Sequence, residues 1–236
     1  MSTSAIVKNP WERITTSNRV LEEDLEVINK YNQKREINKV CLSDYPEPFL
    51  GNLNSEIYVL FGNPGHDKTE SCDHNYTKYQ EKLIFESLSH RSINAKYPNY
   101  FFDPKFKLHL GAIWSKARFM PLLKQIPTSP EKISQRIFCV ELYGYHSYGG
   151  DINLYENLPS STYVKYLVRE AIGHKKVIFI CRAVRKWYNL IPELADYEDC
   201  HIVASNRGIS LSQTTISPTA FKKLRNILKP SEKKNR

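Results

Sequence analysis

One stretch of the chain constrains its fold more than any other. The apolar run 57–61 stops abruptly at Gly62-Asn63-Pro64-Gly65. Five consecutive apolar residues predict a strand that is buried on both faces, as in a parallel sheet. The strand cannot continue, because Pro64 has no N–H for a sheet ladder and the two glycines allow positive φ. The carboxamide of Asn63 is therefore expected at the carboxyl end of a buried strand, where open α/β sheets bind ligands. For a lone Asn-Pro-Gly, an ordinary turn would be the simpler interpretation.

Three more apolar runs, at residues 137–143, 177–181 and 201–204, also predict strands. Helices are expected at residues 11–34, 78–89, 108–124, 160–173, 183–190 and 217–228. This alternation predicts an α/β fold with three layers, α/β/α, around a central, mainly parallel four-stranded sheet. The chain 1–236 is expected to form a single domain whose ends, 1–10 and 230–236, are flexible.

Two of the expected helices carry specific predictions about burial. In the helix 11–34, Asp24 is expected on the polar face, away from the apolar stripe. In the helix 108–124, the stripe expected to be buried is Leu110, Ile113, Trp114, Ala117, Met120 and Leu123.

The chain is basic, with a net charge of +9 and a pI of about 9.2. This charge favours a polyanionic partner, with nucleic acid as the first choice, although a generally basic surface would give the same value. The mean hydropathy is −0.51, and no run approaches the ~20 apolar residues of a membrane-spanning helix. The N-terminus shows no secretory signal. We therefore expect a cytoplasmic protein, acting as a monomer, without membrane association.

The five cysteines include no Cys-x-x-Cys pair, so neither a disulfide framework nor an iron–sulfur cluster is indicated. Cys72 and His74 could be metal ligands, but two such residues in a polar stretch are more simply loop residues. No metal or cofactor is expected.

Three features coincide at the expected carboxyl edge of the sheet. The Asn-Pro-Gly turn follows the first core strand, the polar Glu141 lies near the end of the second, and a polar loop, 205–213, follows the fourth. This arrangement resembles the uracil-DNA glycosylase superfamily, whose first motif in several branches is Gly-x-Asn-Pro-Gly and whose second motif is a short loop after the last core strand. The Pro-x-Pro-Phe-Leu-Gly-Asn segment at 46–52 looks like the lead-in of divergent members. The resemblance extends over roughly residues 45–229.

The resemblance implies a monofunctional DNA glycosylase, which flips a base out of DNA and hydrolyses its N-glycosidic bond to leave an abasic site. Asn63 matches the asparagine that positions the attacking water in relatives with Asn-Pro-Gly. Relatives commonly carry a histidine in the second motif, but residues 205–213 contain none. Asn206 would take its place, or His66 from the first loop.

The resemblance also implies the residues around the base and the DNA. The base pocket would include Gly62, Pro64, Gly65, Glu141 and Tyr143. The DNA contacts would include Ser205, Arg207, Gly208, Ser210 and Arg182. A tyrosine from a nearby loop could stack on the extruded base, and the candidates are Tyr76, Tyr143, Tyr145 and Tyr148.

Two departures from the family pattern bear on the substrate. Glu141 takes a position where relatives often carry a base-reading amide, and a carboxylate accepts hydrogen bonds from the exocyclic amine of cytosine or adenine. It fits uracil poorly unless it is protonated, and it could instead pair with Arg182. Strict uracil enzymes of the superfamily carry a tyrosine at the position of Gly65, where it blocks substituents at C5. The substrate implied is therefore a 5-substituted pyrimidine, such as the glucosylated hydroxymethylcytosine of phage DNA, which would indicate a role in phage defence.

Other functions remain open at this point. A second α/β hydrolase class, acting on nucleotides, would require a glycine-rich phosphate loop or an acidic metal cluster. The sequence contains neither Gly-x-Gly-x-x-Gly nor a P-loop motif. A DNA-binding relative with a decayed catalytic site would explain the missing histidine. An α/β scaffold without catalytic activity is the third alternative.

Overall fold

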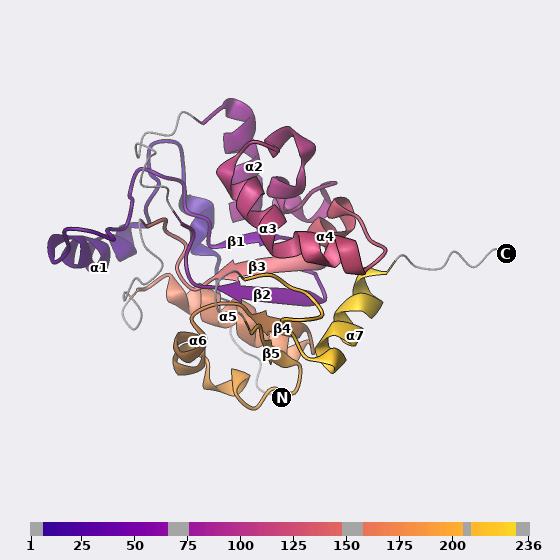
Figure 1. The fold of residues 1–236 in the computed structure, drawn as a ribbon. Helices are drawn as coiled ribbons and strands as arrows, with labels where there is room; N and C mark the ends of the chain where they lie inside the picture. Colours follow the sequence, from indigo (N-terminus) through magenta and orange to yellow (C-terminus); the bar gives the residue numbers. More distant parts are fainter. Residues whose placement is uncertain (1–6, 66–75, 148–157, 205–208, 230–236) are drawn as a thin grey trace.

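The computed structural model describes residues 7–65, 76–147, 158–204 and 209–229. These residues form an α/β fold around a five-stranded sheet with the strand order β1-β3-β2-β4-β5 (Figure 1). The strands are β1 (Phe49–Gly51), β2 (Ile57–Phe61), β3 (Ile137–Glu141), β4 (Val177–Ile180) and β5 (Cys200–Ile202). Four of them, β2 to β5, run parallel, and β1 runs antiparallel to β3. The α/β class and the mainly parallel sheet are thus confirmed.

The expected number of four strands is wrong, because β1 is a fifth strand at the edge of the sheet. It has only three residues and follows Pro46 and Pro48, a setting that an edge strand tolerates. The strand ends at Gly51, whose φ is +114°. A Cβ on Gly51 would lie 2.3 Å from the carbonyl oxygen of Ile137, so this approach of β1 to β3 requires glycine.

The strands β2 and β3 end side by side, because Phe61 pairs with Glu141 in parallel register. The chain therefore leaves both strands at the same edge of the sheet. Two backbone hydrogen bonds join the segments that follow: the N–H of Tyr143 donates to the carbonyl of Gly62 (3.0 Å), and the N–H of Ser147 donates to that of Pro64 (3.2 Å). This paired edge positions the site described below.

Two apolar clusters cover the two faces of the sheet. In β2, Tyr58 and Leu60 belong to one cluster, and Ile57, Val59 and Phe61 belong to the other. The first cluster includes side chains of α2 (Lys78–Leu88), α5 (Ser161–Gly173) and α6 (Val184–Leu190). The second includes side chains of α4 (Pro130–Arg136) and α7 (Pro218–Leu228). The long helix α3 (Leu110–Gln125) contributes to both.

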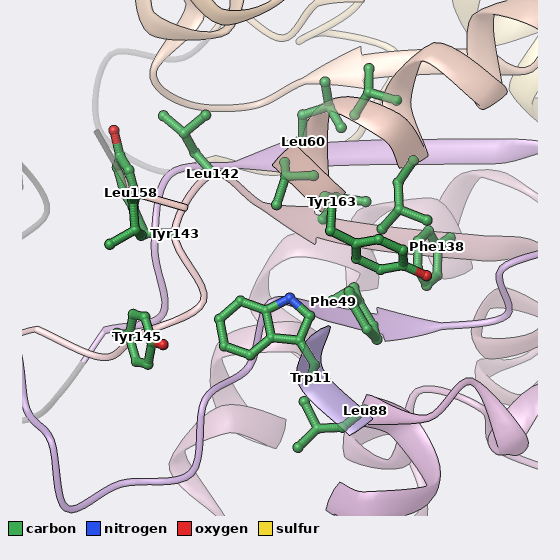
Figure 2. Close-up of a cluster of buried hydrophobic side chains, with 14 of the residues drawn as sticks. Trp11, Phe49, Leu60, Leu88, Phe138, Leu142, Tyr143, Tyr145, Leu158 and Tyr163 are labelled. Carbon is green, nitrogen blue, oxygen red and sulfur yellow. The ribbon is translucent and has the colours of Figure 1, made fainter. Parts of the chain in front are cut away.

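The expected helix 11–34 is wrong in its first half. The structure contains a short 3₁₀ turn, Pro10–Arg13, and then α1 (Glu22–Gln33). Between them the N–H of Asn18 donates to the side-chain hydroxyl of Thr15 (3.1 Å). Ser, Thr and Asn side chains that bond the backbone in this way compete with helix formation, which explains the interruption. Trp11, in the 3₁₀ turn, is fully buried in the first cluster (Figure 2).

The predicted exposure of Asp24 is also wrong, because its side chain is completely buried. Its carboxylate accepts hydrogen bonds from the hydroxyl of Tyr145 (2.8 Å) and from the backbone N–H of Ser160 (3.0 Å). Burial raises the pKa of Asp24, and these two hydrogen bonds act in the opposite direction. The carboxylate thus joins α1 to the start of α5 and to the chain that follows β3.

Sequence periodicity did not predict α4 or three 3₁₀ turns, Arg91–Asn94, Tyr100–Phe102 and Pro104–Phe106. The signal for α4 was present, since Ser129 caps the helix by accepting from the N–H of Lys132 (3.1 Å) and Pro130 occupies the first turn. Among the described residues, no helix combines the length and apolar character needed to cross a membrane.

Candidate functional site

A cavity of about 490 Å³ lies at the carboxyl edge of β2 and β3. The described residues that line it come from the end of β2 with the turn 63–65, the end of β3 with His146 beyond it, the segment 44–50, α2 with Tyr76 before it, and the stretch 99–118, which includes the first half of α3. Cavities of about 300–1,000 Å³ are typical of small-molecule sites. The turn at Asn63, which the sequence singled out, therefore borders a cavity large enough for a base with a substituent.

Asn63 is held in one orientation at the cavity wall. Its Nδ2 donates to the carbonyl oxygen of Pro64 (3.0 Å) and to the hydroxyl of Ser147 (2.8 Å). Because a carbonyl oxygen can only accept, the amide nitrogen must face Pro64. Among the described residues none donates to Oδ1, so this oxygen is available as an acceptor.

His146 is a cavity residue that sequence reasoning did not assign. Its Nδ1 lies 2.9 Å from the carbonyl oxygen of Gly65, so Nδ1 carries a proton. Its Nε2 lies 3.9 Å from Oε2 of Glu47, which also lines the cavity and accepts a hydrogen bond from the hydroxyl of Tyr100 (3.2 Å). The available signal was position: His146 follows the second predicted strand, and Glu47 lies in the lead-in between two prolines.

Glu141 places a buried carboxyl group in the same cavity. Its Oε2 has no hydrogen-bond partner among the described residues. Burial raises the pKa of Glu141 well above its usual value, and the charge of Glu47 raises it further, while that of Arg182 lowers it. No ion pair between Glu141 and Arg182 occurs in the described structure, in contrast to the alternative pairing considered from the sequence. A neutral carboxyl group can both donate and accept, so uracil is not excluded on the ground of charge.

The tyrosines expected near the base lie in different environments. Tyr76 lines the cavity, and its ring packs edge-on against that of Tyr45 at 4.8 Å. Tyr143 and Tyr145 belong instead to the first apolar cluster (Figure 2), where each is at most 3% exposed. Tyr148 lies outside the described residues. Of the described candidates, Tyr76 alone borders the cavity.

The helix α3 has the opposite orientation to the one predicted. Leu110, Ile113, Trp114 and Met120, which were expected to be buried, are 38–50% exposed. The buried positions of α3 are Ala112, Ser115, Phe119 and Leu122. Apolar residues occur nearly all round this helix, so a period of 3.6 residues predicted the helix but could not select its inner face. The outer face borders the cavity through Leu110, Ile113, Trp114, Ala117 and Arg118.

Arg118 and Trp114 form a pair on this face. The guanidinium carbon lies 4.5 Å from the centroid of the Trp114 ring. The buried Nε of Arg118 has no hydrogen-bond partner within the described ranges. Burial lowers the pKa of Arg118, as does the nearby positive charge of Arg182. The pair therefore presents a cation at the cavity wall, and the Nε–H of this cation donates to no group of the described residues.

The other predicted site residues are distributed as follows. Pro64 and Gly65 line the cavity, whereas Gly62, Tyr143, Ser210 and the exposed Arg182 do not. His66 and the residues Ser205, Asn206, Arg207 and Gly208 lie outside the described part of the chain. The segment after them reaches α3, since the N–H of Leu211 donates to the carbonyl of Arg118 (3.0 Å).

Gly65 has neither the positive φ nor the close backbone contact that makes glycine necessary at Gly51. Its φ is not positive, and a Cβ there would meet no atom of the described residues within 4 Å, its two chain neighbours aside. Neither the backbone nor the packing requires glycine at this position, so a side chain would extend into open space at the cavity.

Within the described residues, no cluster of three or more His, Cys, Asp or Glu side chains could hold a metal ion. Comparisons with protein-family models, curated proteins and solved structures yield no match for this chain.

Proposed function

We propose that the protein is a monofunctional DNA glycosylase, which takes an extruded base into this cavity and hydrolyses its N-glycosidic bond. The fold that we propose for it is the three-layer α/β/α arrangement of the uracil-DNA glycosylase superfamily. The observation that carries the proposal is the fixed carboxamide of Asn63, which shares one cavity with the buried carboxyl group of Glu141.

The role proposed for Asn63 follows from its hydrogen bonds. Because Nδ2 is engaged with Pro64 and Ser147, Oδ1 can accept a hydrogen bond from a water molecule. A water oriented in this way presents a lone pair to the anomeric carbon of the sugar. Holding the water and the sugar in one geometry removes part of the entropic barrier to their reaction.

Charge develops on both sides of the breaking bond. The sugar becomes positive, and the carboxylate of Glu47 would stabilise it electrostatically. The departing base becomes negative, and protonated His146 could donate to it from Nε2, since Nδ1 is engaged with the carbonyl of Gly65. His146 would thus supply the donor that relatives take from the second motif.

The identity of the base is proposed from Glu141 and Gly65. A neutral Glu141 could donate to N3 of cytosine and accept from its exocyclic amine, or donate to O4 of uracil and accept from its N3–H. The open space at Gly65 and the cavity of about 490 Å³ favour a pyrimidine with a substituent at C5. A glucosylated hydroxymethylcytosine of phage DNA is the specific candidate.

The experiment that tests the function is a panel of oligonucleotides bearing uracil, 5-hydroxymethylcytosine or its glucoside, each single-stranded and in duplex. Abasic sites are detected by alkaline strand cleavage. We expect cleavage at one of the 5-substituted cytosines. Cleavage at uracil alone would refute the modified-base assignment, and DNA binding without any abasic site would indicate a non-catalytic DNA-binding protein.

A further inference from the structure

The stretch of chain that passes along the cavity and continues through α3 contains no acidic residue. Residues 104–130 have no Asp or Glu, although the whole chain has 25. They carry five lysines and arginines: Lys105, Lys107, Lys116, Arg118 and Lys124. Within the described structure, none of the five forms an ion pair with a carboxylate. This stretch therefore has a local positive charge that no carboxylate of the described residues neutralises.

The same stretch exposes large apolar side chains. Leu108 is 81% exposed, Ile113 50%, Leu110 44% and Trp114 38%. We call these four residues the α3 ridge. Leu110, Ile113 and Trp114 follow the spacing of one helix face, and all three also line the cavity. The ridge is thus continuous with the candidate site rather than a separate surface.

Two aromatic rings near the α3 ridge, those of Trp114 and Tyr79, each have a positively charged side chain stacked over the ring. Trp114 lies under the guanidinium of Arg118 and packs against Phe61 of β2 at 5.1 Å. At the start of the stretch 104–130, Nζ of Lys105 lies 4.9 Å from the ring centroid of Tyr79, and Tyr79 is 42% exposed. Exposed rings interleaved with cations are the composition of surfaces that bind single-stranded nucleic acid, where bases stack and phosphates meet the cations.

We propose that the α3 ridge, with Lys105, Lys107 and Arg118, is a docking surface for a single strand of DNA. The bases next to the nucleotide in the cavity stack on Trp114 and contact Leu108, and Arg118 binds a phosphate at the cavity mouth. The inference rests on the proposed function in one respect. It assumes that the docked strand is the strand whose base enters the cavity.

A basic, apolar helix face could also bind an anionic membrane surface. Two observations favour DNA. Arg118, whose buried Nε has no partner among the described residues, borders the cavity, and the ring of Trp114 packs against Phe61, two residues before Asn63. A membrane would meet the ridge without using the cavity, so it would leave both features without a role.

Tryptophan fluorescence gives a direct test, because Trp114 is exposed while Trp11 and Trp187 are completely buried. Titration with unmodified oligothymidylate should quench part of the emission, since stacked bases quench indole fluorescence. The variant Trp114→Phe should lose this quenching. In parallel, the anisotropy of a labelled oligothymidylate gives the affinity.

Two variants remove exposed side chains of the surface, Lys107→Ala and Leu108→Ala, and a third, Arg118→Ala, removes the partly buried cation that lines the cavity. We expect each to weaken binding about fivefold or more, and the two charge variants to reduce the salt slope by about one. The matched controls Lys34→Ala and Ile37→Ala remove an exposed cation and an apolar residue that is 71% exposed, both just after α1. They should bind as the parent protein does.

Unchanged affinity in the three variants, or binding without quenching, would overturn the docking surface. Binding to phosphatidylserine vesicles but not to oligothymidylate would overturn it in favour of a membrane. Abasic-site formation by the parent protein is scored separately. Its absence together with ridge-dependent binding would refute the proposed function and leave the docking surface intact.

Discussion

The Nδ2 of Asn63 donates a hydrogen bond to the hydroxyl of Ser147, 2.8 Å away, across the ends of two neighbouring strands. Ser147 is 1% exposed, and its own N–H donates to the carbonyl of Pro64. The carboxamide is therefore fixed by a second loop and not only by its own turn. This contact determines which atom of Asn63 faces the cavity.

Removing this hydroxyl should affect catalysis more than stability. In Ser147→Ala, the amide of Asn63 loses one of its two acceptors, so we expect excision to fall about tenfold because the water is held less firmly. The free energy of unfolding should fall by only about 1 kcal/mol. Urea unfolding and single-turnover excision measure the two effects. The control is Ser55→Ala, which removes another buried serine hydroxyl, bonded to the carbonyl of Gln135; equal loss of activity in both variants would contradict the positioning role.

The raised pKa of Glu141 predicts how stability depends on pH. Because the folded protein holds this proton more tightly than the unfolded chain, the free energy of unfolding falls as the pH rises above the usual value of 4.5 and on through the folded pKa. One such group contributes a slope of at most about 1.4 kcal/mol per pH unit. Glu141→Gln removes this contribution, so the variant should gain stability relative to the parent protein as the pH increases. Urea unfolding at a series of pH values measures the difference, and a difference that does not vary with pH would show that folding does not raise the pKa of Glu141.

The open space at Gly65 predicts a change in substrate preference. Gly65→Tyr should place a ring at the cavity and reduce excision of 5-substituted pyrimidines about tenfold or more, while uracil is affected less. Gly65→Ala is the size control, and it should leave both activities unchanged because a Cβ meets no atom within 4 Å. The ratio of kcat/KM for the two substrates is the measurement. A ratio that stays the same in Gly65→Tyr would mean that the C5 side of the base does not face this position.

The buried carboxylate of Asp24 predicts a stability effect far from the cavity. In Asp24→Asn, a single oxygen must replace two acceptors for Tyr145 and the N–H of Ser160, so we expect a loss of about 1–3 kcal/mol. The neighbouring Glu22→Gln changes an exposed carboxylate in the same turn and should be neutral. Thermal unfolding of the two variants measures the contrast. Equal melting temperatures would show that the hydrogen bonds to Asp24 contribute little.

The sequence predicted the parts of this structure in which local pattern and tertiary environment agree. The run 57–61 is apolar at every position, and as expected it forms a fully buried strand, which ends at Phe61 just before the turn that holds Asn63. Strand β1 was missed because three residues after two prolines show no period, and they pair through the distant β3. The face of α3 was predicted wrongly because both of its sides are apolar, and tertiary packing, such as that of Phe119 against Phe102, decides which side is covered.

In the candidate site, too, the residues marked by a local sequence pattern could be predicted, and those placed by distant contacts could not. Asn63, Pro64, Gly65 and Glu141 could be assigned to the cavity because they end consecutive core strands of the sheet. His146 was not assigned, since its relation to Gly65 depends on a hydrogen bond between residues 81 positions apart. No periodicity encodes such a contact.

Asn63→Ala tests the central claim most directly. Abasic-site formation should be measured for the parent protein and this variant, purified in the same way, on the same panel of modified oligonucleotides, together with their affinity for each DNA. The account predicts that the parent protein forms abasic sites, and that the variant binds DNA equally well but reacts at least about 100-fold more slowly. Equal rates for the two proteins, or no abasic sites with any substrate, would contradict it.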